Sequence, residues 1–151
     1  MDTTQRVIRF RGERSFLSNF YNCRVHAWGE TFTSVEAAYQ YKQAVFNGDN
    51  ETAQLIKKAK SGREAKRLSK RIKVRKCEEW SKTKRAIMYA LLMRKFKDSD
   101  LARQLIDTGD MLLVEQVASA LGYWGLSRNG TPGKNVLGEL LMKVRTRLQK
   151  Q

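Results

Sequence analysis

The chain has 151 residues, a length that suits one domain and allows a core without disulfide or metal staples. Its two cysteines and single histidine argue against a disulfide framework, a histidine-based zinc site and a serine–histidine catalytic triad. The net charge of +15 favours phosphate-bearing partners. The sequence shows neither an apolar run long enough for a membrane span nor a signal-peptide core, so we expect a cytoplasmic or nuclear protein that does not engage a membrane.

Two short extended segments are expected first, at Val7–Phe10 and Phe20–Val25, because β-branched and aromatic residues gather there. Three capping residues, Thr33, Asn50 and Ser61, and apolar periodicity then predict helices. The predicted ranges are 33–47, 50–59, 61 onward, 78–97, 99–108 and 135–148. A strand is expected at Leu112–Val117, followed by a glycine-punctuated loop over residues 122–134. This order predicts a mainly helical α+β fold with a small β element, in one domain over residues 1–151.

The first predicted helix carries the most informative polar residues. Glu36, Gln40 and Gln43 stand at i, i+4 and i+7, so they share one face. A carboxylate there could bind ribose hydroxyls, activate water or stabilise a cationic transition state. The alternative is that Glu36 only closes a capping box with Thr33.

Two lysines lie on apolar helical stripes. Lys42 lies on the apolar stripe of the first helix. Either its side chain extends so that the ammonium reaches solvent, or the ammonium lies in a cleft and has a lowered pKa. Lys84 lies one turn after Trp80 and could reach a phosphate at the edge of a cleft. Trp80 at such a position is usually a core residue.

Two further segments could meet phosphate. The segment from Lys57 to Lys76 holds eleven basic residues and one acid, Glu64. It is either a solvated face or a phosphate or nucleic-acid surface, and no aromatic residue interleaves with it. Residues 123–135 form a glycine-rich loop that leads into a helix start, a junction that suits a phosphate.

Taken in order, these segments resemble the NADAR family, named for NAD and ADP-ribose, which includes YbiA-like proteins. The similarity covers almost the whole chain. It rests on residues 16–21, 34–40 and 65–68, on Trp80 with Lys84 and Met88, on Lys95-Phe96, and on residues 108–110, 113–115, 123–125 and 133–138.

The resemblance implies a small, mainly helical α+β domain that cleaves N-glycosidic bonds. Members are associated with ribose–nitrogen cleavage in riboflavin-pathway intermediates and with removal of ADP-ribose from guanine bases. It implies Glu36 as the catalytic carboxylate, with Lys42 as a second candidate, on an ADP-ribosyl or phosphoribosyl substrate and without a metal or cofactor. The residues expected to line the substrate pocket are Ser18, Asn19, Tyr39, Gln40, Trp80, Lys84, Trp124, Gly125 and Asn135.

Two positions depart from the family pattern. Many members carry a lysine where this chain has Gln43, and here the lysine is one place earlier, at Lys42. Many also carry an aspartate at the position of Leu121. An N-glycosidase is expected from the resemblance. Two alternatives remain: a module that binds ADP-ribose or modified nucleic acid without cleaving it, and a plain nucleic-acid binder with a vestigial pocket.

Overall fold

A computed structural model of the chain describes residues 5–117, 122–127 and 133–151. The chain divides into two compact units. The central unit is Asn19–Lys95, and the terminal unit combines Met1–Ser18 with Phe96–Gln151. The single domain expected over residues 1–151 stays a prediction.

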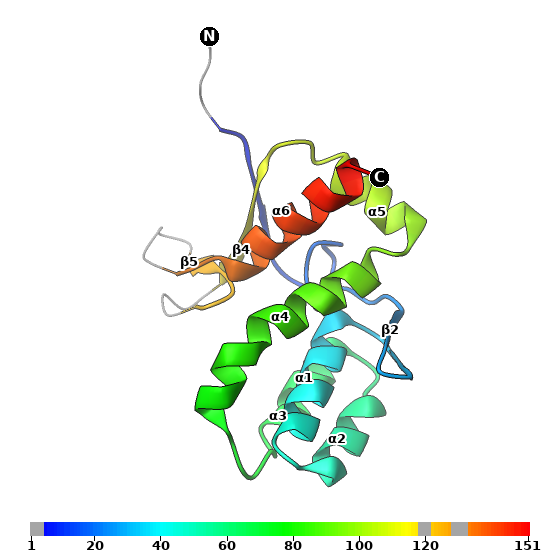
Figure 1. The fold of residues 1–151 in the computed structure, drawn as a ribbon, viewed down its shortest axis with the longest axis vertical. Helices are drawn as coiled ribbons and strands as arrows, with labels where there is room; N and C mark the ends of the chain where they lie inside the picture. Colours follow the sequence, from blue (N-terminus) through cyan, green and yellow to red (C-terminus); the bar gives the residue numbers. More distant parts are fainter. Residues whose placement is uncertain (1–4, 118–121, 128–132) are drawn as a thin grey trace. The chain divides into compact units, whose positions relative to one another are not determined.

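The central unit is built around one buried helix. Its elements are β2 (Val25–Ala27), β3 (Glu30–Phe32), α1 (Val35–Phe46), α2 (Asn50–Lys57), α3 (Gly62–Ser69) and α4 (Cys77–Lys95). Helix α1 contacts α2, α3 and α4 (Figure 1). Its residues 35–40 are all buried. A helix covered on several sides holds its polar side chains in a fixed, water-poor environment.

Local capping chemistry sets where these helices begin. Ser34 caps α1 by accepting a hydrogen bond from the Ala37 N–H at 3.0 Å, so the predicted cap at Thr33 is wrong by one residue. Asp49 caps α2 in the same way, one residue before the predicted cap at Asn50. The predicted cap of α3, Ser61, is confirmed by its bond from the Glu64 N–H.

The first strands of the central unit differ from the expectation. The chain becomes a strand only at Val25, so the strand predicted over residues 20–25 is wrong except at its last residue. Strands β2 and β3 form an antiparallel hairpin closed by Trp28 and Gly29, whose φ angles are 53° and 75°. Strand β3 was not predicted, because three residues are too few to show an alternating pattern.

The terminal unit is a small parallel sheet with two helices. Strands β1 (Val7–Phe10), β4 (Leu112–Val117) and β5 (Leu126–Ser127) lie in the order β1-β4-β5. The predicted strands at β1 and β4 are confirmed with the same bounds, whereas β5 lies within residues predicted as loop. Helix α6 (Val136–Gln149) contacts β4 and α5 (Ser99–Ile106).

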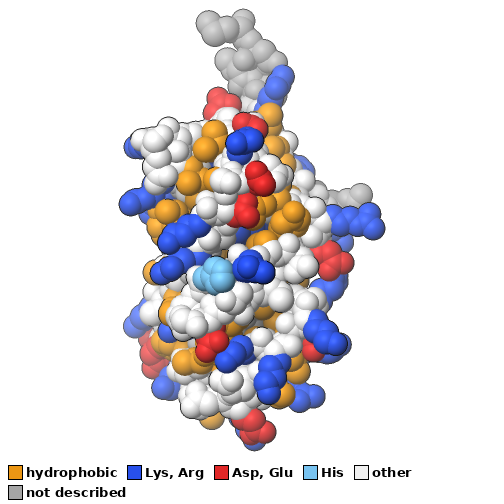
Figure 2. Space-filling view, turned by 90° about the vertical axis from the view of Figure 1, so that its right-hand side faces the viewer, with side chains coloured by type: hydrophobic (Ala, Val, Ile, Leu, Met, Phe, Trp, Pro, Cys, Tyr) orange, Lys and Arg blue, Asp and Glu red, His pale blue; other side chains and the backbone are white. Residues whose placement is uncertain are grey.

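Basic side chains are spread over the face of the molecule that Figure 2 shows, with fewer acidic side chains among them. Among the described residues, no helix is both long and apolar enough to cross a membrane.

Candidate functional site

Glu36 is a buried carboxyl at the start of α1. It is the second helical residue after the Ser34 cap, and its side chain is 7% exposed. Its backbone N–H donates to the Asn19 carbonyl at 3.0 Å, and its Oε1 accepts from Gln40 Nε2 at 2.9 Å. Because Ser34 and not Thr33 caps the helix, Glu36 does not close the capping box that offered a purely structural explanation for it.

Burial dominates the electrostatics of this carboxyl. Loss of water raises the pKa of Glu36, while the Gln40 hydrogen bond and the positive charge of Lys66 oppose that rise. The Lys66 ammonium lies 5.6 Å from the centre of the Phe20 ring. A desolvated carboxyl with a displaced pKa is a frequent property of catalytic groups.

Two buried amide oxygens accompany Glu36. Asn19 Oδ1 and Gln40 Oε1 have no hydrogen-bond partner among the described residues, although the two residues are only 5% and 8% exposed. Asn19 Nδ2 donates to Met88 Sδ at 3.4 Å, and Gln40 Nε2 donates to Glu36, so both amides present their oxygens. Buried acceptors without partners destabilise the protein, and a ligand that supplies hydroxyl or N–H donors would satisfy them.

A glycine fixes the distance between α3 and the start of α1. A Cβ on Gly62 would lie 2.9 Å from Ser34 Oγ and 3.2 Å from Glu36 Cβ. Only a residue without a side chain allows this approach. Sequence reasoning missed Gly62, because a glycine after a capping serine carries no signal of a tertiary contact.

Tyr39 and Trp80 pack against each other inside the central unit. Their ring centroids are 5.3 Å apart, and Trp80 Nε1 donates to the Tyr39 hydroxyl at 3.2 Å. Each is 6% exposed, and Trp80 also meets Phe46. Lys84 is half-buried, one turn further along α4. Substrate contact by these three predicted residues stays a prediction.

Lys42 does not share the face of Glu36. Six residues along a helix correspond to a rotation of about 240°. The Lys42 ammonium lies 4.8 Å from the centre of the Trp28 ring, in the hairpin, where a cation–π contact holds it. The structure thus joins Lys42 to the hairpin, and its catalytic role stays a prediction.

The remaining predicted pocket residues belong to the terminal unit. Ser18 is 2% exposed, and Trp124 lies against Tyr123 with ring centroids 4.7 Å apart. A Cβ on Gly125 would lie 2.5 Å from the Glu115 carbonyl oxygen, so the backbones of β4 and this loop are in close contact. Leu121 lies outside the described residues.

Asn135 ties the start of α6 to β4. Its Oδ1 accepts from the Glu115 N–H at 3.1 Å, and its Nδ2 donates to the Leu113 carbonyl at 2.9 Å. The N–H groups of Val136 and Leu137 donate to loop carbonyls. The first N–H groups of α6, which the sequence suggested for a phosphate, are therefore already used within the protein.

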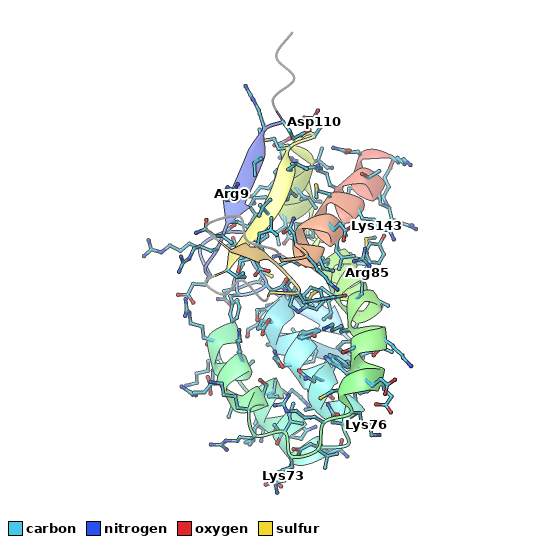
Figure 3. The ribbon with its side chains drawn as sticks, turned by 90° about the vertical axis from the view of Figure 1, so that its left-hand side faces the viewer. Arg9, Lys73, Lys76, Arg85, Asp110 and Lys143 are labelled. Carbon is cyan, nitrogen blue, oxygen red and sulfur yellow. The ribbon has the colours of Figure 1, made fainter. Side chains whose placement is uncertain are left out.

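The basic segment from Lys57 to Lys76 is largely a solvated face. Ala65 and Ile72 are buried, and most of the cations are exposed. Lys73 and Lys76 lie where α3 passes into α4 (Figure 3). Nucleic-acid binding by this face stays a prediction.

Comparisons with known proteins bear on the family to which the chain belongs. The NADAR domain model matches residues 9–149. The chain is 32% identical to an N-glycosidase of Nostoc punctiforme, over 87% of this chain and 84% of that protein. It is 30% identical to the N-glycosidase YbiA of Shigella boydii, over 87% of this chain and 79% of that protein.

One relative is much longer. The chain is 32% identical to a riboflavin biosynthesis protein of Vibrio vulnificus, over 89% of this chain but only 35% of that protein. The chain therefore spans about a third of that relative.

The structural comparison extends over almost the whole chain. The NMR structure of the Escherichia coli protein YbiA matches with a TM-score of 0.82 and 27% identity, over 99% of this chain and 88% of that one. The predicted mainly helical α+β, YbiA-like fold is thereby confirmed. The chain belongs to the NADAR family.

Proposed function

We propose that this protein is an N-glycosidase that hydrolyses the ribose C1′–N bond of an ADP-ribosyl or phosphoribosyl substrate, with Glu36 as its catalytic carboxylate. The observation that supports this most strongly is the buried Glu36 carboxyl beside two amide oxygens without partners, Asn19 Oδ1 and Gln40 Oε1. Relatives named N-glycosidases share about 30% of the sequence.

A buried carboxylate beside hydrogen-bond acceptors supports such a cleavage on chemical grounds. As the C1′–N bond breaks, its electron pair leaves with the nitrogen and positive charge develops on the sugar ring. The Glu36 carboxylate stabilises that charge and accepts a proton from the attacking water, whose oxygen bonds to C1′. The departing nitrogen takes up the proton.

The amide oxygens suit the hydroxyl groups of ribose. Asn19 Oδ1 and Gln40 Oε1 accept hydrogen bonds, and the 2′- and 3′-hydroxyls of ribose donate them. Because Gln40 also donates to Glu36, a ribose held by Gln40 is held next to the carboxylate. The substrate thereby removes the cost of two buried acceptors as it binds.

The contact of Lys42 with Trp28 favours one alternative. If the chemistry needs a second catalytic group near Glu36, Lys42 does not supply it in this arrangement. The protein would then bind an ADP-ribosyl group through the same acceptors without cleaving it.

A glycosidase assay with product identification tests the proposal. The substrates are an oligonucleotide with ADP-ribosylated guanine and, separately, a phosphoribosylated aminopyrimidine. We expect release of ADP-ribose or ribose phosphate, and a loss of about 100-fold or more in Glu36→Gln. The control is Glu51→Gln, which removes an exposed carboxylate from α2 and should leave the rate unchanged.

Two results would point elsewhere. Binding of the ADP-ribosyl substrate by calorimetry without any product supports the binding module. Full activity in Glu36→Gln rules out the proposed role of the carboxylate.

A further inference from the structure

Trp28 occupies a position at which tryptophan is unfavourable. It is the first of the two residues that close the β2–β3 hairpin, and both have positive φ, 53° for Trp28 and 75° for Gly29. Two-residue hairpin loops of this kind favour Asn-Gly, and a bulky side chain at positive φ is a true outlier. Such strain tends to persist where the side chain has a function.

The ring is held in place but remains accessible. The Phe32 ring meets it at 74° with centroids 6.4 Å apart, and the Lys42 ammonium lies 4.8 Å from its centre. Despite these two contacts, Trp28 is 43% exposed. An aromatic ring oriented by its neighbours and open to solvent is ready to stack on a planar ligand.

The ring borders a hollow that one cation, Arg94, also lines. The hollow has a volume of about 530 Å³ and is lined by residues 26–31 and Arg94. Its acidic residue, Glu30, is paired with Lys57 at 3.1 Å, so its charge is offset. Arg94 and Lys42 add positive charge beside the ring, which favours an anionic ligand.

We propose that this hairpin surface, consisting of residues 26–31 with Lys42 and Arg94, binds single-stranded nucleic acid. An unpaired base stacks on Trp28, and the neighbouring phosphates contact Lys42 and Arg94. The strand must be single, because bases in a duplex do not expose their faces. This interaction adds a binding surface on the side of α1 that Glu36 does not occupy.

The basic segment that begins at Lys57 reaches the same surface. Lys57 contacts Glu30 of the hairpin, so the first cation of this segment lies at the hairpin surface. That segment has charge but no interleaved aromatic residue, and Trp28 supplies the missing stacking partner.

Fluorescence anisotropy of a labelled 12-nucleotide strand tests this proposal by binding alone, independently of any turnover. The decisive variant is Trp28→Asn, which removes the ring and places the favoured Asn-Gly pair in the turn, so the fold is retained. We expect wild-type affinity to fall with salt and Trp28→Asn to bind about tenfold more weakly. Arg94→Gln should lower the slope of log affinity against log salt by about one.

Val74→Asn is the matched control, because Val74 is an apolar residue of the same unit, 62% exposed, within the basic segment. Its affinity should equal that of the wild type. The proposal is overturned if Trp28→Asn binds as tightly as the wild type, if a duplex binds as well as the single strand, or if no strand binds. The last result would leave the ring as a contact for a protein partner.

Discussion

Lys95 provides a sharp test of how burial shapes this protein. It is the last residue of α4, and its side chain is 1% exposed. Burial lowers the pKa of Lys95 to about 8 from an ordinary value of 10.5, and charge at Cys23 offsets part of that shift. The ring of Tyr21 lies 5.7 Å from the ammonium. We predict that Lys95→Met stabilises the protein at neutral pH.

The sign follows from proton binding in the two states. Below pH 8 Lys95 is protonated both folded and unfolded, so the folded state carries the full cost of the buried charge. A gap of about 2.5 pKa units corresponds to about 3 kcal/mol. Between pH 8 and 10.5 the folded state loses the proton while the unfolded state keeps it, so wild-type stability from this group rises with pH.

Urea unfolding of wild type and Lys95→Met at pH 7 and pH 10 measures this effect. We expect the variant to be more stable at pH 7 and its advantage to shrink by about 2 kcal/mol at pH 10. Lys97→Met, which removes an exposed lysine two residues away, should show no such change with pH. An equal difference in stability between Lys95→Met and wild type at both pH values would show that the buried Lys95 charge does not destabilise the folded protein.

Three further predictions concern packing and the carboxyl. Gly138→Ala should destabilise the protein by about 3 kcal/mol in chemical unfolding, because its Cβ would lie 2.0 Å from the Leu113 carbonyl oxygen. Helix propensity alone predicts that the variant gains about 1 kcal/mol of stability. A variant more stable than the wild type would therefore contradict the close contact. Glu36→Gln should be more stable than wild type at pH 7 but not below pH 4, because burial raises the pKa of Glu36 and the folded state resists its ionisation; urea titrations at the two pH values show whether the difference disappears. Lys66→Gln should move the acidic limb of the pH profile of kcat/KM to higher pH, because the Lys66 charge lowers the pKa of Glu36. An unchanged profile would show that Lys66 does not influence the carboxyl.

The strands of four or more residues were predicted from the sequence, and the shorter ones were not. Strand β4 shows its apolar run in the sequence, and the structure confirms its bounds. The start of α1 was displaced because Thr33 and Ser34 can both cap a helix, and Glu36 stands three residues after the wrong one. The hairpin and β5 have too few residues for any periodicity to appear.

The candidate site shows the same division. The i, i+4 spacing placed Glu36 and Gln40 on one face, and the hydrogen bond between them confirms that placement. Asn19 reaches Glu36 through a backbone hydrogen bond from outside the helix. The close approach of Gly62 and the ring beneath Lys42 arise from tertiary packing, which spacing in the sequence does not encode.

A single-turnover rate is the sharpest measurement of whether the Glu36 carboxylate cleaves a ribose–nitrogen bond. Calorimetry first establishes which substrate binds, an ADP-ribosylated guanine oligonucleotide or a phosphoribosylated aminopyrimidine. The enzyme is then held in excess over that substrate. We predict that Glu36→Gln binds the substrate like the wild type but cleaves it about 100-fold or more slowly. A Glu36→Gln rate equal to that of the wild type and of Glu51→Gln would contradict it.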